Sequence, residues 1–173
     1  MPDVPLTAGD AGRCHIAYIA LGSNLEQPVL QVRQAFEELE QLPFTQLLLR
    51  SALYRSEPLG RQDQPDFINA VVKIATGLAP HALLAALLAI EQHHGRMRES
   101  LNAPRTLDMD ILLYDDLQYN DALLTVPHPR MHLRAFVLQP LQEIAPDCVI
   151  PGYGPVVDLL AICTGQRLQR EPD

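Results

Sequence analysis

The sequence predicts an α+β fold in which helices pack on an antiparallel sheet. The chain has 173 residues, 47% of them hydrophobic and 20% charged, which suits one domain with a hydrophobic core. Its apolar residues recur with the periods of a strand, a helix, two strands, a helix and a strand, in that order. This βαββαβ succession is typical of a ferredoxin-like sandwich, and we expect extra C-terminal helices and loops around it.

The first strand and the first helix are predicted before Pro43. Six apolar residues follow His15, so a buried strand is expected over 15–21. The Gly-Ser-Asn sequence at 22–24 predicts a tight turn and a helix N-cap, and the alternative is that this turn cradles a phosphate. Five apolar residues at helical spacing predict the amphipathic helix that follows: Leu25, Val29, Val32, Phe36 and Leu39.

Two strands and a second helix come next. The segments 46–55 and 69–76 are rich in β-branched and apolar residues, which predicts strands. The polar, proline-marked loop 56–66 between them is long for a compact domain, and this length favours a functional role. The second helix is expected over 80–95, from a proline that suits its first turn to a glycine that ends it.

The ends of the chain and its composition limit the possible functions. We expect a flexible leader at 1–14, a single domain at 15–165 and a C-terminal tail at 166–173. No apolar run reaches the roughly 18 residues that cross a bilayer, and the start lacks the pattern of a signal peptide. A net charge of −8 disfavours nucleic-acid binding. We therefore expect a cytoplasmic monomer without nucleic-acid or membrane partners.

The cysteines and basic residues narrow the chemistry further. Cys14, Cys148 and Cys163 are too widely spaced for a disulfide framework or a zinc cluster, and we interpret them as small apolar residues. Lys73 is the only lysine among 13 basic residues, so no Walker-type phosphate loop is present. The remaining basic residues are arginines, whose planar donors suit phosphate.

Two aspartates mark the last predicted strand, which runs to Tyr114. Successive side chains of a strand point to opposite faces, so Asp108 and Asp110 share one face. Like charges so close call for a counter-ion, and Mg²⁺ is usually held by one or two carboxylates together with phosphates and waters. The alternative is that both aspartates line the solvated face of an edge strand.

Three arginines precede these carboxylates, namely Arg96, Arg98 and Arg105. Carboxylates for a metal and arginines for phosphate together predict a phosphoryl-transfer site. The alternative is that the arginines form surface ion pairs with neighbouring acidic residues.

His128 belongs to a second cluster, in which prolines on both sides restrict the backbone. The imidazole is thus presented from a stiff loop, and His128 and Arg134 are candidates to donate to phosphate oxygens. The alternative is a structural, hydrogen-bonded histidine.

A third cluster suits a planar heterocycle. Phe67 and Asn69 lie two residues apart at the start of a strand, so they face the same way. An aromatic ring with a carboxamide that donates and accepts can stack on and read such a ligand, and Phe136 can cover its other face. The alternative is that both phenylalanines belong to the core.

With these motifs in place, the chain resembles the 6-hydroxymethyl-7,8-dihydropterin pyrophosphokinases of folate biosynthesis. The resemblance implies transfer of diphosphate from ATP to the hydroxymethyl group of the pterin, with release of AMP. Four segments carry it: AYIALGSNL (17–25), EPLGRQDQPDFINAV (57–71), PRTLDMDILLY (104–114) and TVPHPRMHLRAFVLQPL (125–141).

The resemblance also assigns roles to individual residues. It implies that Asp108 and Asp110 bind two Mg²⁺ ions and that Arg96 and Arg105 join them as catalytic residues. The nucleotide is expected at Arg98, Ile111, Thr125, His128 and Arg134. The pterin is expected at Ser56, Leu59, Phe67, Asn69 and Phe136.

Two other functions compete with this interpretation. A different two-metal phosphoryl or nucleotidyl transferase would use the same aspartates and arginines. A ferredoxin-like ligand-binding or regulatory module would lack catalysis altogether.

Overall fold

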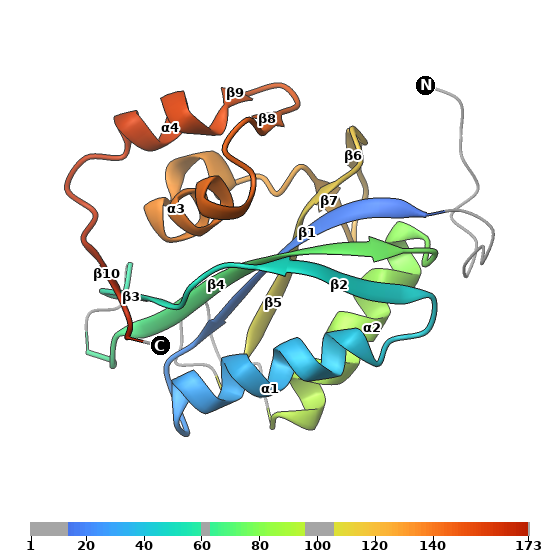
Figure 1. Cartoon of the computed structure of the whole chain (residues 1–173), viewed down its shortest axis with the longest axis horizontal. Helices are drawn as coiled ribbons and strands as arrows, with labels where there is room; N and C mark the ends of the chain where they lie inside the picture. Colours follow the sequence, from blue (N-terminus) through green and yellow to red (C-terminus); the bar gives the residue numbers. More distant parts are fainter. Residues whose placement is uncertain (1–13, 60–62, 96–105, 173) are drawn as a thin grey trace.

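A six-stranded antiparallel sheet forms the centre of the protein, and helices cover both of its faces (Figure 1). The structure is a computed structural model that describes residues 14–59, 63–95 and 106–172. The sheet strands are β1 (His15–Ser23), β2 (Thr45–Arg50), β3 (Tyr54–Ser56), β4 (Phe67–Thr76), β5 (Asp108–Tyr114) and β10 (Leu168–Arg170). The helices are α1 (Pro28–Glu40), α2 (Pro80–His93), α3 (Ala135–Ile144) and α4 (Val156–Ile162), with a 3-10 turn η1 at Met131–Leu133. Two small hairpins consist of β6 (Tyr119–Asn120) with β7 (Thr125–Val126) and β8 (Val149–Ile150) with β9 (Gly154–Pro155).

The central strand β1 pairs with β4 on one side and with β5 on the other. The far edge of β4 pairs with β2 and β3, and β10 lies outside β3. All of these pairings are antiparallel. Up to β5, the elements follow the predicted βαββαβ order, except that two strands, β2 and β3, stand in place of the one predicted over 46–55.

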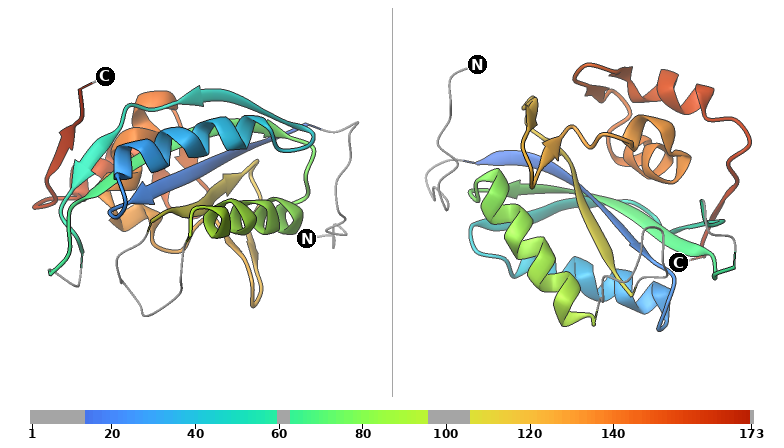
Figure 2. Two further views of the ribbon diagram at one scale, coloured as in Figure 1. Left: turned by 90° about the horizontal axis from the view of Figure 1, so that it is seen from below. Right: turned by 180° about the vertical axis from the view of Figure 1, so that it is seen from behind.

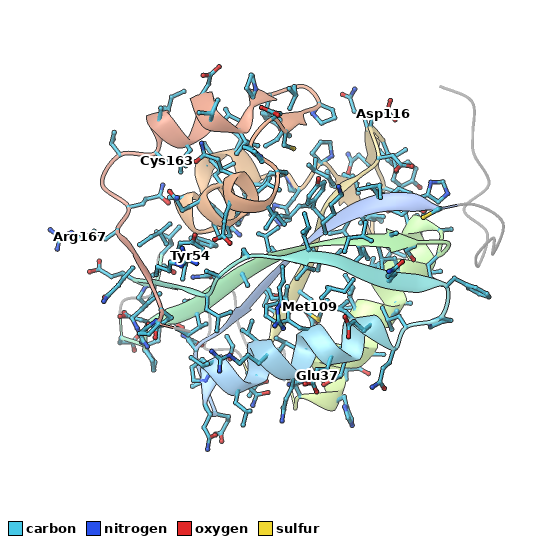
Figure 3. The ribbon with its side chains drawn as sticks, viewed as in Figure 1. Glu37, Tyr54, Met109, Asp116, Cys163 and Arg167 are labelled. Carbon is cyan, nitrogen blue, oxygen red and sulfur yellow. The ribbon has the colours of Figure 1, made fainter. Side chains whose placement is uncertain are left out.

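The sheet lies between two layers of helices (Figure 2), and a hydrophobic core fills each side. Alternate side chains of β1 and β4, such as Ile19 and Val72, pack under α1 and α2. Met109 points from β5 toward the same two helices (Figure 3). The opposite face, which includes Val71 and Leu112, packs against α3 and α4. The prediction of an antiparallel sheet with helices packed on it is thus confirmed, and the C-terminal helices cover the second face.

Three local expectations need correction. Helix α1 begins at Pro28 with Gln27 as its N-cap, so the 22–24 segment does not cap it. The strand predicted over 46–55 is interrupted after Arg50, because the Ala52 N–H donates to the Glu143 carboxylate of α3 instead of pairing in the sheet.

The third correction concerns the C-terminal segment 166–173. Its residues 168–170 form β10, whose hydrogen bonds to β3 extend the sheet by one strand. A short polar segment gives little local strand signal, so only the pairing with β3 reveals it.

The remaining expectations concern the cysteines, the N-terminal leader and membrane crossing. Cys148 and Cys163 pack against the second core, as small apolar residues do, whereas Cys14 is exposed. All three cysteines are free. The leader predicted at 1–14 lies almost entirely outside the described residues. Within the described part of the chain, no helix combines the length and the apolar character that a membrane crossing requires.

Candidate active site

Small residues of the central strand leave a shallow floor on the face that α3 covers. The register aligns Gly22 of β1 with Asn69 on β4 and with Asp108 on β5. One step along, Ala20 is aligned with Asp110. Neighbouring strands lie about 4.8 Å apart, so the carboxamide and the two carboxylates stand on opposite sides of this floor.

Above the floor lies a pocket with a cavity volume of about 140 Å³. Of the eleven predicted site residues that the structure describes, it brings together nine: Ser56, Leu59, Phe67, Asn69, Asp108, Asp110, His128, Arg134 and Phe136. They come from β3, β4, β5, α3 and the loops between them, so segments far apart in the sequence meet in one place.

Asn69 is held rigidly at one end of the pocket. Its side chain is 4% exposed, and its Nδ2 atom donates to the Tyr54 carbonyl at 3.1 Å and to the Ser56 hydroxyl at 2.8 Å. Both amide hydrogens are used inside the protein, which leaves Oδ1 as an acceptor facing the space above Gly22. Phe67, two residues before Asn69, lines the same pocket, as predicted.

The two carboxylates lie at the other end, on β5. The Asp110 side chain is 40% exposed, and its Oδ2 atom lies 4.0 Å from Nε2 of His128. Among the described residues, no group of three or more His, Cys, Asp or Glu side chains forms a metal site. Two carboxylates facing a hollow instead fit Mg²⁺, which takes its remaining ligands from phosphates and water.

His128 is neutral at physiological pH. Burial lowers its pKa to about 4, and the positive charges of Arg134 and Arg130 lower it while the Asp108 carboxylate opposes them. Nδ1 accepts a hydrogen bond from the Arg130 N–H at 3.1 Å, so the single proton of the neutral ring sits on Nε2. The His128 N–H itself donates to the Leu112 carbonyl at 2.9 Å, which ties the loop to β5. The imidazole is therefore positioned as a neutral donor beside the carboxylates.

Arg134 and Phe136 form the wall that faces the sheet. Arg134 precedes α3, and its guanidinium carbon lies 5.5 Å from the centre of the Phe136 ring. This distance is within the range of a cation–π contact, which orients both groups.

Two polar residues at the end of β1, Ser23 and Asn24, hold the loops at the rim of the pocket, a role that the sequence did not reveal. Asn24 is 1% exposed, and its Nδ2 atom donates to Oε1 of Gln64 at 2.8 Å and to the Pro65 carbonyl at 3.1 Å. The Ser23 hydroxyl donates to the Thr106 carbonyl at 2.5 Å. The segment 22–24, whose first two residues belong to β1 and do not form the predicted tight turn, thus anchors the segments that lead to Phe67 and to Asp108.

Two of the predicted residues that the structure describes, Ile111 and Thr125, do not line the pocket. The Ile111 side chain is 3% exposed and packs in the core under α1 and α2, so only its backbone is available to a ligand. Thr125 lies on β7 and donates to Oδ1 of Asn120 at 2.7 Å. Arg96, Arg98 and Arg105 lie outside the described residues.

The pocket also contains polar residues that the sequence analysis did not select, namely Glu57, Gln64 and Arg130. Each belongs to a segment that carries a predicted site residue. Their position within these segments could have identified Glu57, Gln64 and Arg130 as site residues. Their residue types alone did not distinguish them from polar residues of the surface.

Three comparisons connect this geometry to known proteins. A model of the 7,8-dihydro-6-hydroxymethylpterin-pyrophosphokinase (HPPK) family matches residues 18–146. The chain is 47% identical over 155 residues to 2-amino-4-hydroxy-6-hydroxymethyldihydropteridine pyrophosphokinase of Pseudomonas aeruginosa, covering 90% of this chain and 96% of the relative. It is 49% identical over 144 residues to the protein of that name from Haemophilus influenzae, covering 83% and 90%. The fold resembles wild-type HPPK-DHPS of Plasmodium falciparum crystallised with pterin and p-hydroxybenzoate, with a TM-score of 0.67 at 14% identity. That match covers 86% of this chain but 43% of the longer one.

Proposed function

This chain belongs to the 7,8-dihydro-6-hydroxymethylpterin-pyrophosphokinase family, and we propose that its pocket transfers diphosphate from ATP to 6-hydroxymethyl-7,8-dihydropterin. The observation that carries the assignment is the arrangement across Gly22. A hydrogen-bonding carboxamide on β4 and two carboxylates on β5 face one hollow from opposite sides. An acceptor alcohol held at one end can then meet a nucleotide held at the other.

The pterin occupies the end of the pocket at Asn69. Because Asn69 has its Nδ2 atom bonded to Tyr54 and Ser56, Oδ1 is oriented to accept from an N–H of the ring. Phe67 and Phe136 supply aromatic faces for stacking. Ser56 and Leu59 add backbone hydrogen bonds.

ATP occupies the end at β5. Asp108 and Asp110 would hold two Mg²⁺ ions, which would supply positive charge next to the transferring phosphates. His128 donates through Nε2 to a phosphate oxygen without adding charge, and Arg134 contributes a fixed positive charge. Ile111 and Thr125 are expected beside the nucleotide, Ile111 through its backbone. We also propose that Arg98 binds the nucleotide and that Arg96 and Arg105 stabilise the transferring group, although all three lie outside the described residues.

The transfer needs no covalent intermediate with the protein. The hydroxymethyl oxygen of the pterin attacks the β-phosphorus of ATP, the bond from this phosphorus to the bridging α-phosphate oxygen breaks, AMP leaves with that oxygen, and the hydroxyl proton is released. The residues of the pocket orient the two reactants and exclude water, which would otherwise compete as the acceptor.

Finer features of the protein belong to the same proposal. The strand order β5, β1, β4, β3 supports a ferredoxin-like arrangement of the first five sheet strands, with β2 and β3 together as one edge. The monomeric state of the protein and its location in the cytoplasm stay predictions.

The decisive experiment is to incubate the protein with Mg²⁺, ATP and 6-hydroxymethyl-7,8-dihydropterin and to identify the nucleotide product. Equal amounts of AMP and pterin diphosphate are expected. ADP as the product would make the protein a simple kinase, and AMP release that does not require the pterin would contradict the assigned acceptor.

A further inference from the structure

The C-terminal segment 166–171 connects two walls of the pocket that come from distant parts of the chain. At one end, Gln166 contacts the backbone that leads into α3. At the other end, β10 pairs with β3, where Leu168 lies opposite Ser56. Ser56 and α3 both face the pocket, from the pterin end and from the Arg134 wall.

The carboxamide of Gln166 binds the peptide groups on both sides of Arg134. Its Oε1 atom accepts from the Ala135 N–H at 2.9 Å, and its Nε2 atom donates to the Leu133 carbonyl at 2.9 Å. A side-chain amide with one donor and one acceptor in use thus spans the single residue between η1 and α3. Because both bonds are made at once, they restrict the backbone angles of Arg134.

Helix α3 needs this contact, because it begins without a cap of its own. Its N-cap residue is Arg134, which makes no side-chain capping bond. The first N–H groups of a helix have no partner inside the helix. Gln166 therefore satisfies the N–H of Ala135 from a point 31 residues further along the chain.

The far end of the segment is fastened as well. The Glu171 N–H donates to the Leu53 carbonyl at 2.8 Å, and Oε1 of Glu171 accepts from Nε of Arg55 at 2.6 Å. Gln166 is thus held between a paired strand and a helix start, so its position is determined by the fold and not by a free tail.

We infer that Gln166 is a positioning residue of the pocket, which acts through Arg134. It holds the backbone at Arg134 so that the guanidinium is presented to the anionic end of the site. The inference rests on the proposed function, because it is measured through the reaction with ATP and the pterin.

The test compares Gln166→Met, which keeps the length of the side chain but removes both bonds, with Gln169→Met. Gln169 is exposed on β10, and no side-chain hydrogen bond is found for it in the described part of the chain, so it is a matched control. We expect Gln166→Met to lower kcat/KM for ATP about tenfold, since a misplacement of about 1 Å can cost about 100-fold and a loosened backbone at Arg134 should displace the guanidinium by less. Gln169→Met should equal the wild type.

A double-mutant cycle separates positioning from loss of stability. In an Arg134→Gln background, Gln166→Met should lower kcat/KM for ATP less than twofold, because the group that it positions is absent. Hydrogen exchange at the Ala135 amide should accelerate in Gln166→Met and stay unchanged in Gln169→Met. Equal turnover of Gln166→Met and Gln169→Met, or a full tenfold loss that persists in the Arg134→Gln background, would overturn the inference. A wild-type protein that releases no AMP with the pterin would instead refute the proposed function.

Discussion

The Nδ2 atom of Asn69 lies 2.8 Å from the Ser56 hydroxyl, and this bond joins strand β3 to the neighbouring strand β4 inside the pocket. This bond leaves the amide of Asn69 a single orientation, in which Oδ1 faces the hollow. A residue with a preset acceptor discriminates between ligands, because a ligand without a matching donor leaves the buried oxygen unpaired.

Asn69→Ala should therefore weaken pterin use selectively. We expect the KM for the pterin to rise about 10- to 100-fold, which corresponds to the loss of about 1–3 kcal/mol of hydrogen bonding. Ser56→Ala should have a smaller effect, because it removes one support of the amide and not the acceptor. Steady-state kinetics with each substrate varied in turn provides the measurement. An equal rise in the KM for ATP would argue against a pterin subsite at Asn69.

Asp108→Asn and Asp110→Asn should each lower AMP release at least 100-fold at a fixed Mg²⁺ concentration. The amide cannot replace a carboxylate as a charged metal ligand, so more Mg²⁺ should be required for the residual turnover. The matched control is Asp116→Asn, because Asp116 lies just past the other end of β5 (Figure 3) and is exposed. If the Asp108 and Asp110 variants had the same turnover as the control, and the same dependence on Mg²⁺ concentration, the carboxylate pair would be excluded as the metal site.

His128 should titrate far below an ordinary histidine. Its pKa is lowered to about 4, first by burial and then by the charges of Arg134 and Arg130. The imidazole resonances in a pH titration by NMR, without metal or nucleotide, should therefore show a midpoint near 4. Arg134→Gln removes one of the opposing positive charges, so its midpoint should lie higher. A wild-type midpoint near 6.5 would mean that His128 is solvated and is not the neutral donor described above.

Tyr54 should make the protein less stable at alkaline pH. Burial and the hydrogen bond to Glu143 raise its pKa to about 12 from an ordinary value of 10.0, and its side chain is 7% exposed. The unfolded chain loses this proton as the pH rises above 10, whereas the folded protein keeps it until about 12. The contribution of Tyr54 to stability is thus complete below pH 10 and is lost between pH 10 and 12. This loss lowers the free energy of unfolding by at most about 3 kcal/mol.

Urea unfolding at pH 8 and pH 11 measures this effect. Tyr54→Phe should be less stable than the wild type at pH 8, because the Glu143 carboxylate loses a donor. The difference in the free energy of unfolding between the two proteins should be smaller at pH 11 than at pH 8. A constant difference across this range would show that Tyr54 does not titrate in the unfolding equilibrium.

Local sequence determines much of the site because a strand has a fixed alternation. The spacing of Asp108 and Asp110, and that of Phe67 and Asn69, predicted that each pair shares a face, and the pocket contains all four. The order of strands and helices up to β5 could likewise be predicted from apolar periods, apart from the break that divides one predicted strand into β2 and β3. Expectations failed where distant contacts override local preference, as at Asn24, whose amide bonds the loop at Gln64 instead of capping α1.

The sequence by itself determined which chemical groups are available and which of them point the same way along a strand. Only the tertiary structure decided that Asn69 and Asp108 lie on either side of Gly22, because strand register depends on burying both faces of the sheet at once. It also decided that Gln166 caps α3 and that β10 closes the edge beside Ser56. These contacts join residues far apart in the chain, and no local pattern encodes which partner a polar side chain will meet.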